Sequence, residues 1–260
     1  DFAAFASKLD VRDVTFIPMS ALNGDNVVDR SDAMPWYTGK ALLEHLEEVE
    51  IAADEDLDDR RFAVQYVIRP MREKFHDYRG YAGTVAGGVF RPGDAVAVLP
   101  GGRHTTIAGI DTFDGPVDAA APPMSVTIRL ADDIDVSRGN MIVGVDRLPQ
   151  VAQHVEAWVC WMTDRSRLTS GTRLAIKHTT HSARAIVTDV LSRLEINTLA
   201  EDIDADGLAL NEIGRVTLRT TEPLFFDPYR ANRHTGSFIL IDETTNHTVG
   251  AGMLLGTIDE

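Results

Sequence analysis

From residue 61 onward the chain repeats one pattern, in which short apolar segments alternate with turn-forming residues and no amphipathic helix intervenes. In residues 62–68 large apolar side chains stand at every second position, which is the period of a strand with one buried face. Further short strands are expected at 84–85, 95–99, 105–110, 126–130 and 141–143. Many short strands at regular spacing, separated by Gly- and Pro-containing turns, predict a barrel or a sandwich.

A second stretch of the same kind begins near Gln153. Its strands are expected at residues 154–162, 173–178, 183–190, 213–220, 237–241 and near 248–255. Strands without intervening helices form antiparallel sheets. The sequence therefore predicts two all-β domains, at residues 61–148 and 152–260.

The first fifty residues have a different organisation. A helix end is expected within residues 1–10, a short buried strand at 15–19 and a loop with an Asn-Gly turn at 20–26. Between residues 38 and 50, four apolar residues share one helical face, namely Leu42, Leu43, Leu46 and Val49. This order is typical of the last third of an α/β domain, so residues 1–50 are interpreted as a remnant too short to close a core alone.

Charge separates this remnant from the β domains and restricts the possible partners. Between Glu47 and Asp59 the chain has eight acidic residues and no basic ones. Such a run repels itself and favours an extended linker, which we place at residues 51–60. The net charge of the whole chain is −15, and this charge disfavours nucleic acid as a partner unless a basic patch is segregated.

The largest basic cluster lies within residues 69–79. It comprises Arg69, Arg72, Lys74 and Arg79. The cluster is interpreted either as a solvated loop or as a patch for an anionic partner.

The apolar and cysteine content indicates the compartment. No run of 18 apolar residues is present, so no membrane-spanning helix is expected. Cys160 is the only cysteine, which excludes an intrachain disulfide and fits the reducing cytoplasm. It lies in an apolar run, where a buried structural thiol is favoured over a nucleophile.

Two motifs suggest chemistry but have plainer explanations. The glycine-rich segment at residues 83–88 lacks the Lys-Ser/Thr ending of a phosphate-binding loop, and no helix pattern follows it, so bulges and corners of a small barrel are favoured. His178 and His181 have no Cys pair beside them, which favours a loop between strands over a zinc site. No catalytic residue and no metal ligand is therefore assigned from these patterns.

Ser20, Ala21 and Leu22 directly follow the strand expected at residues 15–19. In a nucleotide-binding α/β fold, backbone N–H groups at the carboxyl end of a strand face the ligand. A small residue there lets the backbone approach a base carbonyl closely. Taken alone, however, these three residues fit an ordinary turn better.

Four stretches resemble a known family. The first, FIPMSALNGDNV at residues 16–27, looks like the last guanine-recognition loop of translation-factor GTPases, and the second, MPWYTGKALLE at 34–44, resembles their last G-domain helix. The third, RGYAGTV at 79–85 with GD at 93–94 and RGNMI at 138–142, is similar to their second domain. The fourth comprises EPLFFDPY at 222–229, NR at 232–233, TGSFILID at 235–242 and NHTVGAGM at 246–253, and is typical of the GTP-binding subunit of bacterial sulfate adenylyltransferase (ATP sulfurylase).

This resemblance implies a mainly β protein with two antiparallel translation-factor-type barrels after an α/β remnant of a P-loop G domain. The full-length family member binds GTP with Mg²⁺ and couples GTP hydrolysis to the formation of adenylyl sulfate from ATP and sulfate. Of the family's GTP-contacting segments only Ser20, Ala21 and Leu22 carry over, because the P-loop, the Asp-x-x-Gly motif and the Asn-Lys-x-Asp motif are expected before residue 1. No cofactor and no catalysis are expected of this fragment alone.

The resemblance also implies the partners. A separate small subunit carries the transfer chemistry, and the barrels would act as levers and docking surfaces, with the cluster at residues 69–79 as one candidate contact. Some relatives carry an adenylyl-sulfate kinase after the second barrel, and whether one follows Glu260 stays open. Two alternatives remain: elongation-factor-like barrels that bind tRNA, and an interaction module that has no link to GTP.

Overall fold

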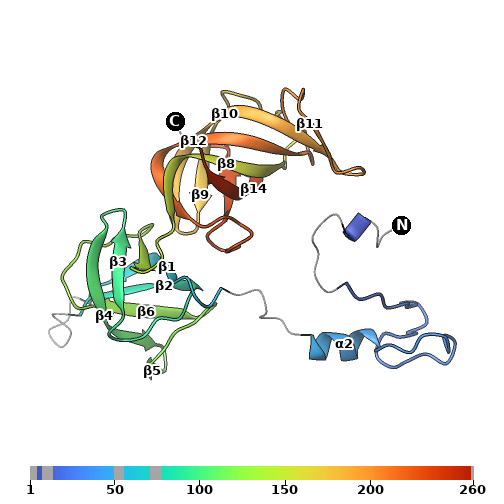
Figure 1. The fold of residues 1–260 in the computed structure, drawn as a ribbon, viewed down its shortest axis with the longest axis horizontal. Helices are drawn as coiled ribbons and strands as arrows, with labels where there is room; N and C mark the ends of the chain where they lie inside the picture. The colour runs from blue at the N-terminus through green and yellow to red at the C-terminus, as the bar shows by residue number, and fades with distance from the viewer. Residues whose placement is uncertain (1–4, 8–13, 50–55, 71–77, 259–260) are drawn as a thin grey trace. The chain divides into compact units, whose positions relative to one another are not determined.

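The computed structural model describes residues 5–7, 14–49, 56–70 and 78–258. The chain divides into two units, residues 1–54 and 55–260, and all the named strands lie in the second unit (Figure 1). Within the described residues no helix is both long and apolar enough to cross a membrane.

The first barrel is built from seven strands. They are β1 (Arg61–Ile68), β2 (Gly80–Gly87), β3 (Ala95–Leu99), β4 (Arg103–Thr112), β5 (Gly115–Pro116), β6 (Ser125–Leu130) and β7 (Met141–Gly144). Neighbouring strands run in the order β3-β7-β1-β2-β6-β4, and antiparallel pairing of β3 with β4 closes the sheet, while β5 extends β4 as a short hairpin. Alternate residues such as Phe62 and Val64 face the core, as their period of two predicts.

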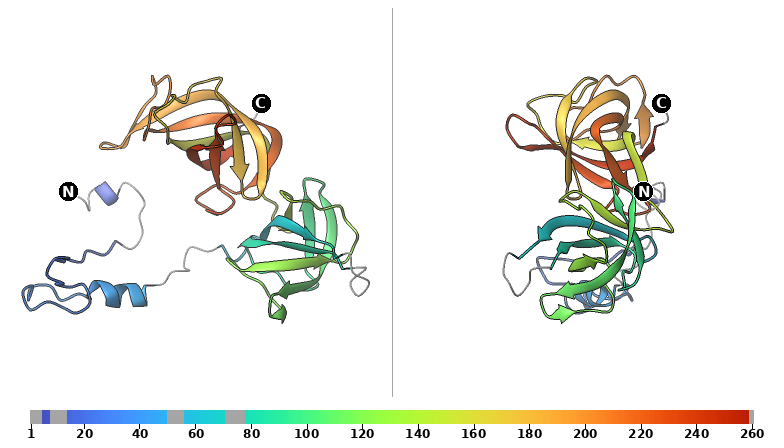
Figure 2. Two further views of the ribbon diagram at one scale, coloured as in Figure 1. Left: turned by 180° about the vertical axis from the view of Figure 1, so that it is seen from behind. Right: turned by 90° about the vertical axis from the view of Figure 1, so that its left-hand side faces the viewer.

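The second barrel repeats this design. Its strands are β8 (Gln150–Trp161), β9 (Arg173–His178), β10 (His181–Glu195), β11 (Ala200–Asp202), β12 (Ile213–Phe226), β13 (Ser237–Ile241) and β14 (Thr248–Thr257). The order β10-β12-β8-β14-β13-β9 is closed by pairing of β9 with β10, and β11 pairs with the outer part of β10. Figure 2 shows both sheets curling closed, and the prediction of two antiparallel barrels is confirmed.

Two strands extend beyond their expected bounds. β10 was expected to end at 190 and β12 at 220, but they continue to Glu195 and Phe226. The added part of β12 contains Pro223, which has no N–H to give to a ladder. The structure accommodates this segment as an irregularity, since β12 pairs with β8 up to Arg219 and resumes at Leu224.

The first unit differs more from expectation. Residues 15–19 form no strand, because no neighbouring strand pairs with them in the part of the chain that is described, and the nearest ladder contact is the single bridge between Ser20 and Asp25. The helix expected at 38–50 is shorter and is labelled α2 (Leu42–Glu48). Most of the helix end expected within residues 1–10 lies outside the described residues.

Candidate functional site: the junction between the barrels

An apolar patch forms the first layer of contact between the two barrels. The strands β3 and β7 are buried on both faces: Val96 and Ile142 point into the first barrel, whereas Leu99 and Met141 point outward. On the outward side they pack, together with Ala97 and Val143, against Phe225 of β12. This explains why residues 95–99 and 141–143 are apolar without alternation, since a strand covered on both faces gains by burying every side chain.

A buried ion pair crosses the junction beside this patch. Arg61 of β1 is 1% exposed and faces Asp227, which follows β12. Arg61 donates two parallel hydrogen bonds to the carboxylate, from Nε to Oδ2 and from Nη2 to Oδ1, each 2.9 Å long. Nη1 of Arg61 donates to the backbone carbonyl oxygens of Arg60 and Arg147, at 3.0 and 2.8 Å. Such a bidentate fork fixes direction as well as distance.

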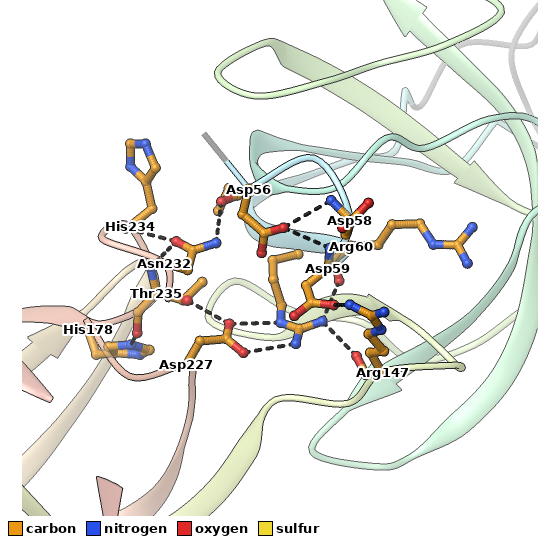
Figure 3. A network of polar contacts seen from close by, with 12 residues as sticks. Asp56, Asp58, Asp59, Arg60, Arg147, His178, Asp227, Asn232, His234 and Thr235 are labelled. Carbon is orange, nitrogen blue, oxygen red and sulfur yellow. Dashed lines mark hydrogen bonds and ion pairs between the residues drawn. The ribbon is translucent and has the colours of Figure 1, made fainter. Parts of the chain in front are cut away.

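The loop after β12 is held in shape around this carboxylate (Figure 3). Thr235 Oγ1 donates to Asp227 Oδ2 at 2.8 Å, and Asn232 Oδ1 accepts from the backbone N–H groups of His234 and Thr235. Asn232 Nδ2 reaches across the junction to the carbonyl oxygen of Ala86 in β2, at 2.8 Å. A Cβ on the neighbouring Gly87 would lie 2.9 Å from that same nitrogen, so glycine is what lets the loop approach β2.

His178, at the end of β9, forms a hydrogen bond to the same loop. Its Nε2 lies 2.6 Å from the carbonyl oxygen of Thr235, which only accepts hydrogen bonds, so Nε2 carries the proton. Burial lowers the pKa of His178 from 6.5 to about 4. The imidazole is therefore neutral at physiological pH and serves as a hydrogen-bond donor.

The segment that leads into β1, residues 56–60, contacts the first barrel through hydrogen bonds and through the ion pair between Arg60 and Asp146. Asp56 Oδ1 accepts from the backbone N–H groups of Asp58 and Asp59, and the carbonyl oxygen of Asp56 accepts from Gly88 N at 2.8 Å. The hydrogen bond from Arg60 lowers the pKa of Asp146. The end of the acidic run is therefore packed against the first barrel, although its composition favours an extended linker.

The expected guanine loop forms a tight turn in the first unit. Ser20 accepts a backbone hydrogen bond from Gly24 at 2.8 Å, and Leu22 is 95% exposed. The buried side chain of Asn26 organises the turn, because its Nδ2 donates to the Pro18 carbonyl. Ala21 is exposed in this turn, and the nucleotide role of the turn stays a prediction.

Only part of the basic cluster at residues 69–79 lies within the described residues. Arg69 is exposed, and Arg79 pairs with Asp133 and donates to the carbonyl oxygen of Ile134. Arg72 and Lys74 lie outside the described residues. Its partner-binding role likewise stays a prediction.

The histidine pair and residues 83–87 of the glycine-rich segment lie in strands. His178 and His181 pair across the β9–β10 turn, and the described residues contain no group of His, Cys, Asp and Glu arranged to hold a metal ion. Gly83 lies within β2, where a Cβ would stand 2.2 Å from the carbonyl oxygen of Ala63. That close approach of two backbones requires glycine.

An open groove of about 570 Å³ lies on the outer wall of the second barrel. Its floor includes one cross-strand row formed by Cys160, Ala251, Ile239 and Lys177. The lining is mainly apolar and contains no carboxylate.

The junction was not identified from the sequence. Arg61 and Asp227 are 166 positions apart, and nothing in the local pattern around either residue shows that they meet. The only available indication was the polar run Asp227, Asn232 and Thr235 within the fourth resembling stretch, where the apolar strand pattern is interrupted.

Comparisons with known proteins agree with this architecture. Residues 154–255 match the family model described as GTP-eEF1A C-terminal domain-like. Two solved structures of sup35, complexed with GMPPNP and with GDP, superpose with TM-scores of 0.72 and 0.70 over 95% of this chain and 60% of theirs. Their sequence identity to this chain is 21%, so they show the fold alone. The barrels therefore have the translation-factor type of fold, and the family model covers the second of them.

Relatives at higher identity cover the whole chain. A bifunctional enzyme CysN/CysC from Mycobacterium tuberculosis (strain ATCC 25618 / H37Rv) is 55% identical over 98% of this chain and 42% of its own length. Sulfate adenylyltransferase subunit 1 from Bacteroides fragilis (strain YCH46) is 45% identical over all of this chain and 53% of its own length. Over its whole length the chain is therefore similar to a region of sulfate adenylyltransferase subunit 1 and of CysN/CysC, and it spans about half the length of the curated relatives it matches.

Proposed function

We propose that this chain is the barrel part of the GTP-binding subunit of a cytoplasmic sulfate adenylyltransferase, and that it carries nucleotide-dependent movement to a catalytic partner subunit. The observation that carries the proposal is the buried fork between Arg61 and Asp227, together with the hydrogen bond from Asn232 to Ala86. These contacts fix one barrel against the other at two separate points. A movement imposed on one barrel is then passed to the second barrel.

The chemistry of the reaction gives such a scaffold a purpose. In adenylyl transfer an oxygen of sulfate attacks the α-phosphorus of ATP, pyrophosphate leaves, and a phosphate–sulfate anhydride forms. This step is steeply uphill, and GTP hydrolysis elsewhere in the full-length protein would supply the drive through a segment that changes order with nucleotide state. The barrels contribute no reacting group.

This chain offers little that could hold GTP itself. The exposed turn at Ser20, Ala21 and Leu22 fits a contact to the guanine base through a backbone N–H, and that contact would contribute roughly 0.5–1.5 kcal/mol. Micromolar affinity requires about 8 kcal/mol. The phosphates and Mg²⁺, which supply most of the affinity in a P-loop GTPase, would be held by segments outside this chain.

A coupled assay tests the proposal. The full-length subunit is combined with its catalytic partner, and adenylyl sulfate formation from ATP and sulfate is measured with and without GTP. We expect GTP-dependent formation in the wild type and a reduced yield of adenylyl sulfate per GTP hydrolysed in Arg61→Met. Wild-type protein that forms no adenylyl sulfate with any partner would remove the enzymatic assignment, and an unchanged yield in Arg61→Met would remove the scaffold role.

A further inference from the structure

The strands β10 and β11 form a two-stranded ribbon that reaches past the wall of the second barrel (Figures 1 and 2). Closure of the barrel uses the first part of β10, whereas its last residues, Arg193 to Glu195, also pair with β11. Among the residues that the structure describes, β11 pairs with β10 alone, so its other edge has no partner there. The ribbon is therefore not needed to close the barrel.

Polar and charged side chains connect the two strands of the ribbon. Arg193 pairs with Asp202 at 2.9 Å and with Glu212 at 3.0 Å, and the Ser192 hydroxyl donates to Glu201 at 2.5 Å. The turn places Leu199 at a φ of 60°, in the left-handed region that a branched side chain rarely adopts. The Arg193–Asp202 ion pair and the Ser192–Glu201 hydrogen bond therefore join the two strands of the ribbon.

The ribbon presents apolar side chains to solvent among carboxylates. Ile203, directly after β11, is 76% exposed, and Ile196, in the turn, is 53% exposed. From Glu195 to Glu212 the sequence has six acidic residues and no basic one. Within the described part of the chain, no cation pairs with Glu195 or Asp204, the carboxylates adjacent in sequence to the two isoleucines.

We propose that the β10–β11 ribbon is a docking surface for the catalytic partner subunit, which receives Ile196 and Ile203 in an apolar pocket with a rim of Lys and Arg. The inference rests on the proposed function. Charge complementarity favours this occupant, because the unpaired carboxylates beside both isoleucines attract a basic rim. Like charges would oppose the same ribbon of a second copy, and the phosphates of a nucleic acid would be repelled.

Binding of the full-length subunit to its catalytic partner tests the inference, measured by titration calorimetry at low and at physiological salt. One variant, Ile196→Ser with Ile203→Ser, removes the apolar anchors, and a second, Glu195→Lys with Asp204→Lys, reverses the charges. Phe113→Ser is the matched control, since Phe113 is a fully exposed apolar residue at a hairpin of the first barrel. Thermal unfolding of each variant checks that it is folded.

We expect the serine variant to weaken binding at least tenfold, which corresponds to about 1.4 kcal/mol. The lysine variant should weaken binding more at low salt than at physiological salt, and Phe113→Ser should bind as the wild type does. Folded ribbon variants that bind within twofold of the wild type would overturn the ribbon inference alone. Wild-type protein that fails to bind the catalytic subunit would instead refute the docking role in the proposed function.

Discussion

Removing the charge of Arg61 should destabilise the pair of barrels far more than removing any exposed arginine. In Arg61→Met the aliphatic stem is largely kept, but Asp227 loses both hydrogen bonds of the fork while only 8% exposed. Thr235 Oγ1 then remains as its side-chain donor. Breaking a buried pair by removing one partner costs about 3–5 kcal/mol, because the remaining charge stays desolvated.

Equilibrium urea unfolding of this chain measures the effect. Trp158 and Trp161 lie in β8 and the first barrel has no tryptophan, so tryptophan fluorescence reports mainly on the second barrel while circular dichroism reports on both. In the wild type we expect the two probes to give one transition for the barrels. In Arg61→Met they should separate, and the summed free energy of unfolding should fall by about 3–5 kcal/mol.

Two control variants make the result specific. Arg147→Met removes an exposed arginine that pairs with Asp59 at 3.3 Å, and such a surface pair contributes about 0–1 kcal/mol. Arg61→Met with Asp227→Leu removes both buried charges and should recover part of the lost stability. If Arg61→Met costs less than 1 kcal/mol and the two probes still coincide, the fork is not what joins the barrels.

Three further outcomes are expected. The pKa of His178 lies at about 4 in the folded state against 6.5 in the unfolded state. The stability that depends on neutral His178 is therefore fully present above pH 6.5 and falls by about 3 kcal/mol as the pH drops to 4. Urea midpoints measured over this pH range should decline less steeply in His178→Gln than in the wild type. Titration calorimetry of this chain with GTP and Mg²⁺ should show no saturable micromolar binding, and such binding would mean that the nucleotide site is misplaced. Reversing the charges of Arg72 and Lys74 in the full-length subunit should weaken binding to the catalytic subunit, more so at low salt, and an unchanged affinity would place the docking surface elsewhere.

The barrels could be predicted from the sequence because their determinants are local. A period of two is visible within five or six residues, and the Gly- and Pro-containing turns that bound each strand are contiguous in the chain. The errors arose where distant residues decide the outcome. Residues 15–19 have the composition of a strand, yet a strand exists only if another pairs with it. The end of β12 was misplaced because pairing with β8 resumes beyond Pro223, at Leu224.

The junction could not be predicted for a related reason. Arg61 precedes an apolar strand and reads as an ordinary solvated arginine at its edge, while Asp227 before Pro228 reads as a turn residue. Each becomes a buried charge only because both barrels close and meet there. The pattern of a single sequence describes the environment of one segment. It carries no information on which outer face of one barrel packs against which face of the other.

The two layers of the junction make different physical contributions. The patch around Phe225, Leu99 and Met141 supplies attraction, but apolar burial is non-directional and would tolerate small rotations of one barrel on the other. The fork between Arg61 and Asp227 allows little rotation of one barrel on the other, because both of its N–H···O hydrogen bonds must stay aligned. The hydrogen bond from Asn232 to Ala86 adds a second fixed point on another strand. A buried ion pair often gives little net stability compared with apolar residues of the same volume, so its contribution here is better understood as selecting one relative orientation. For a scaffold that transmits movement, that orientation is the property on which function would depend.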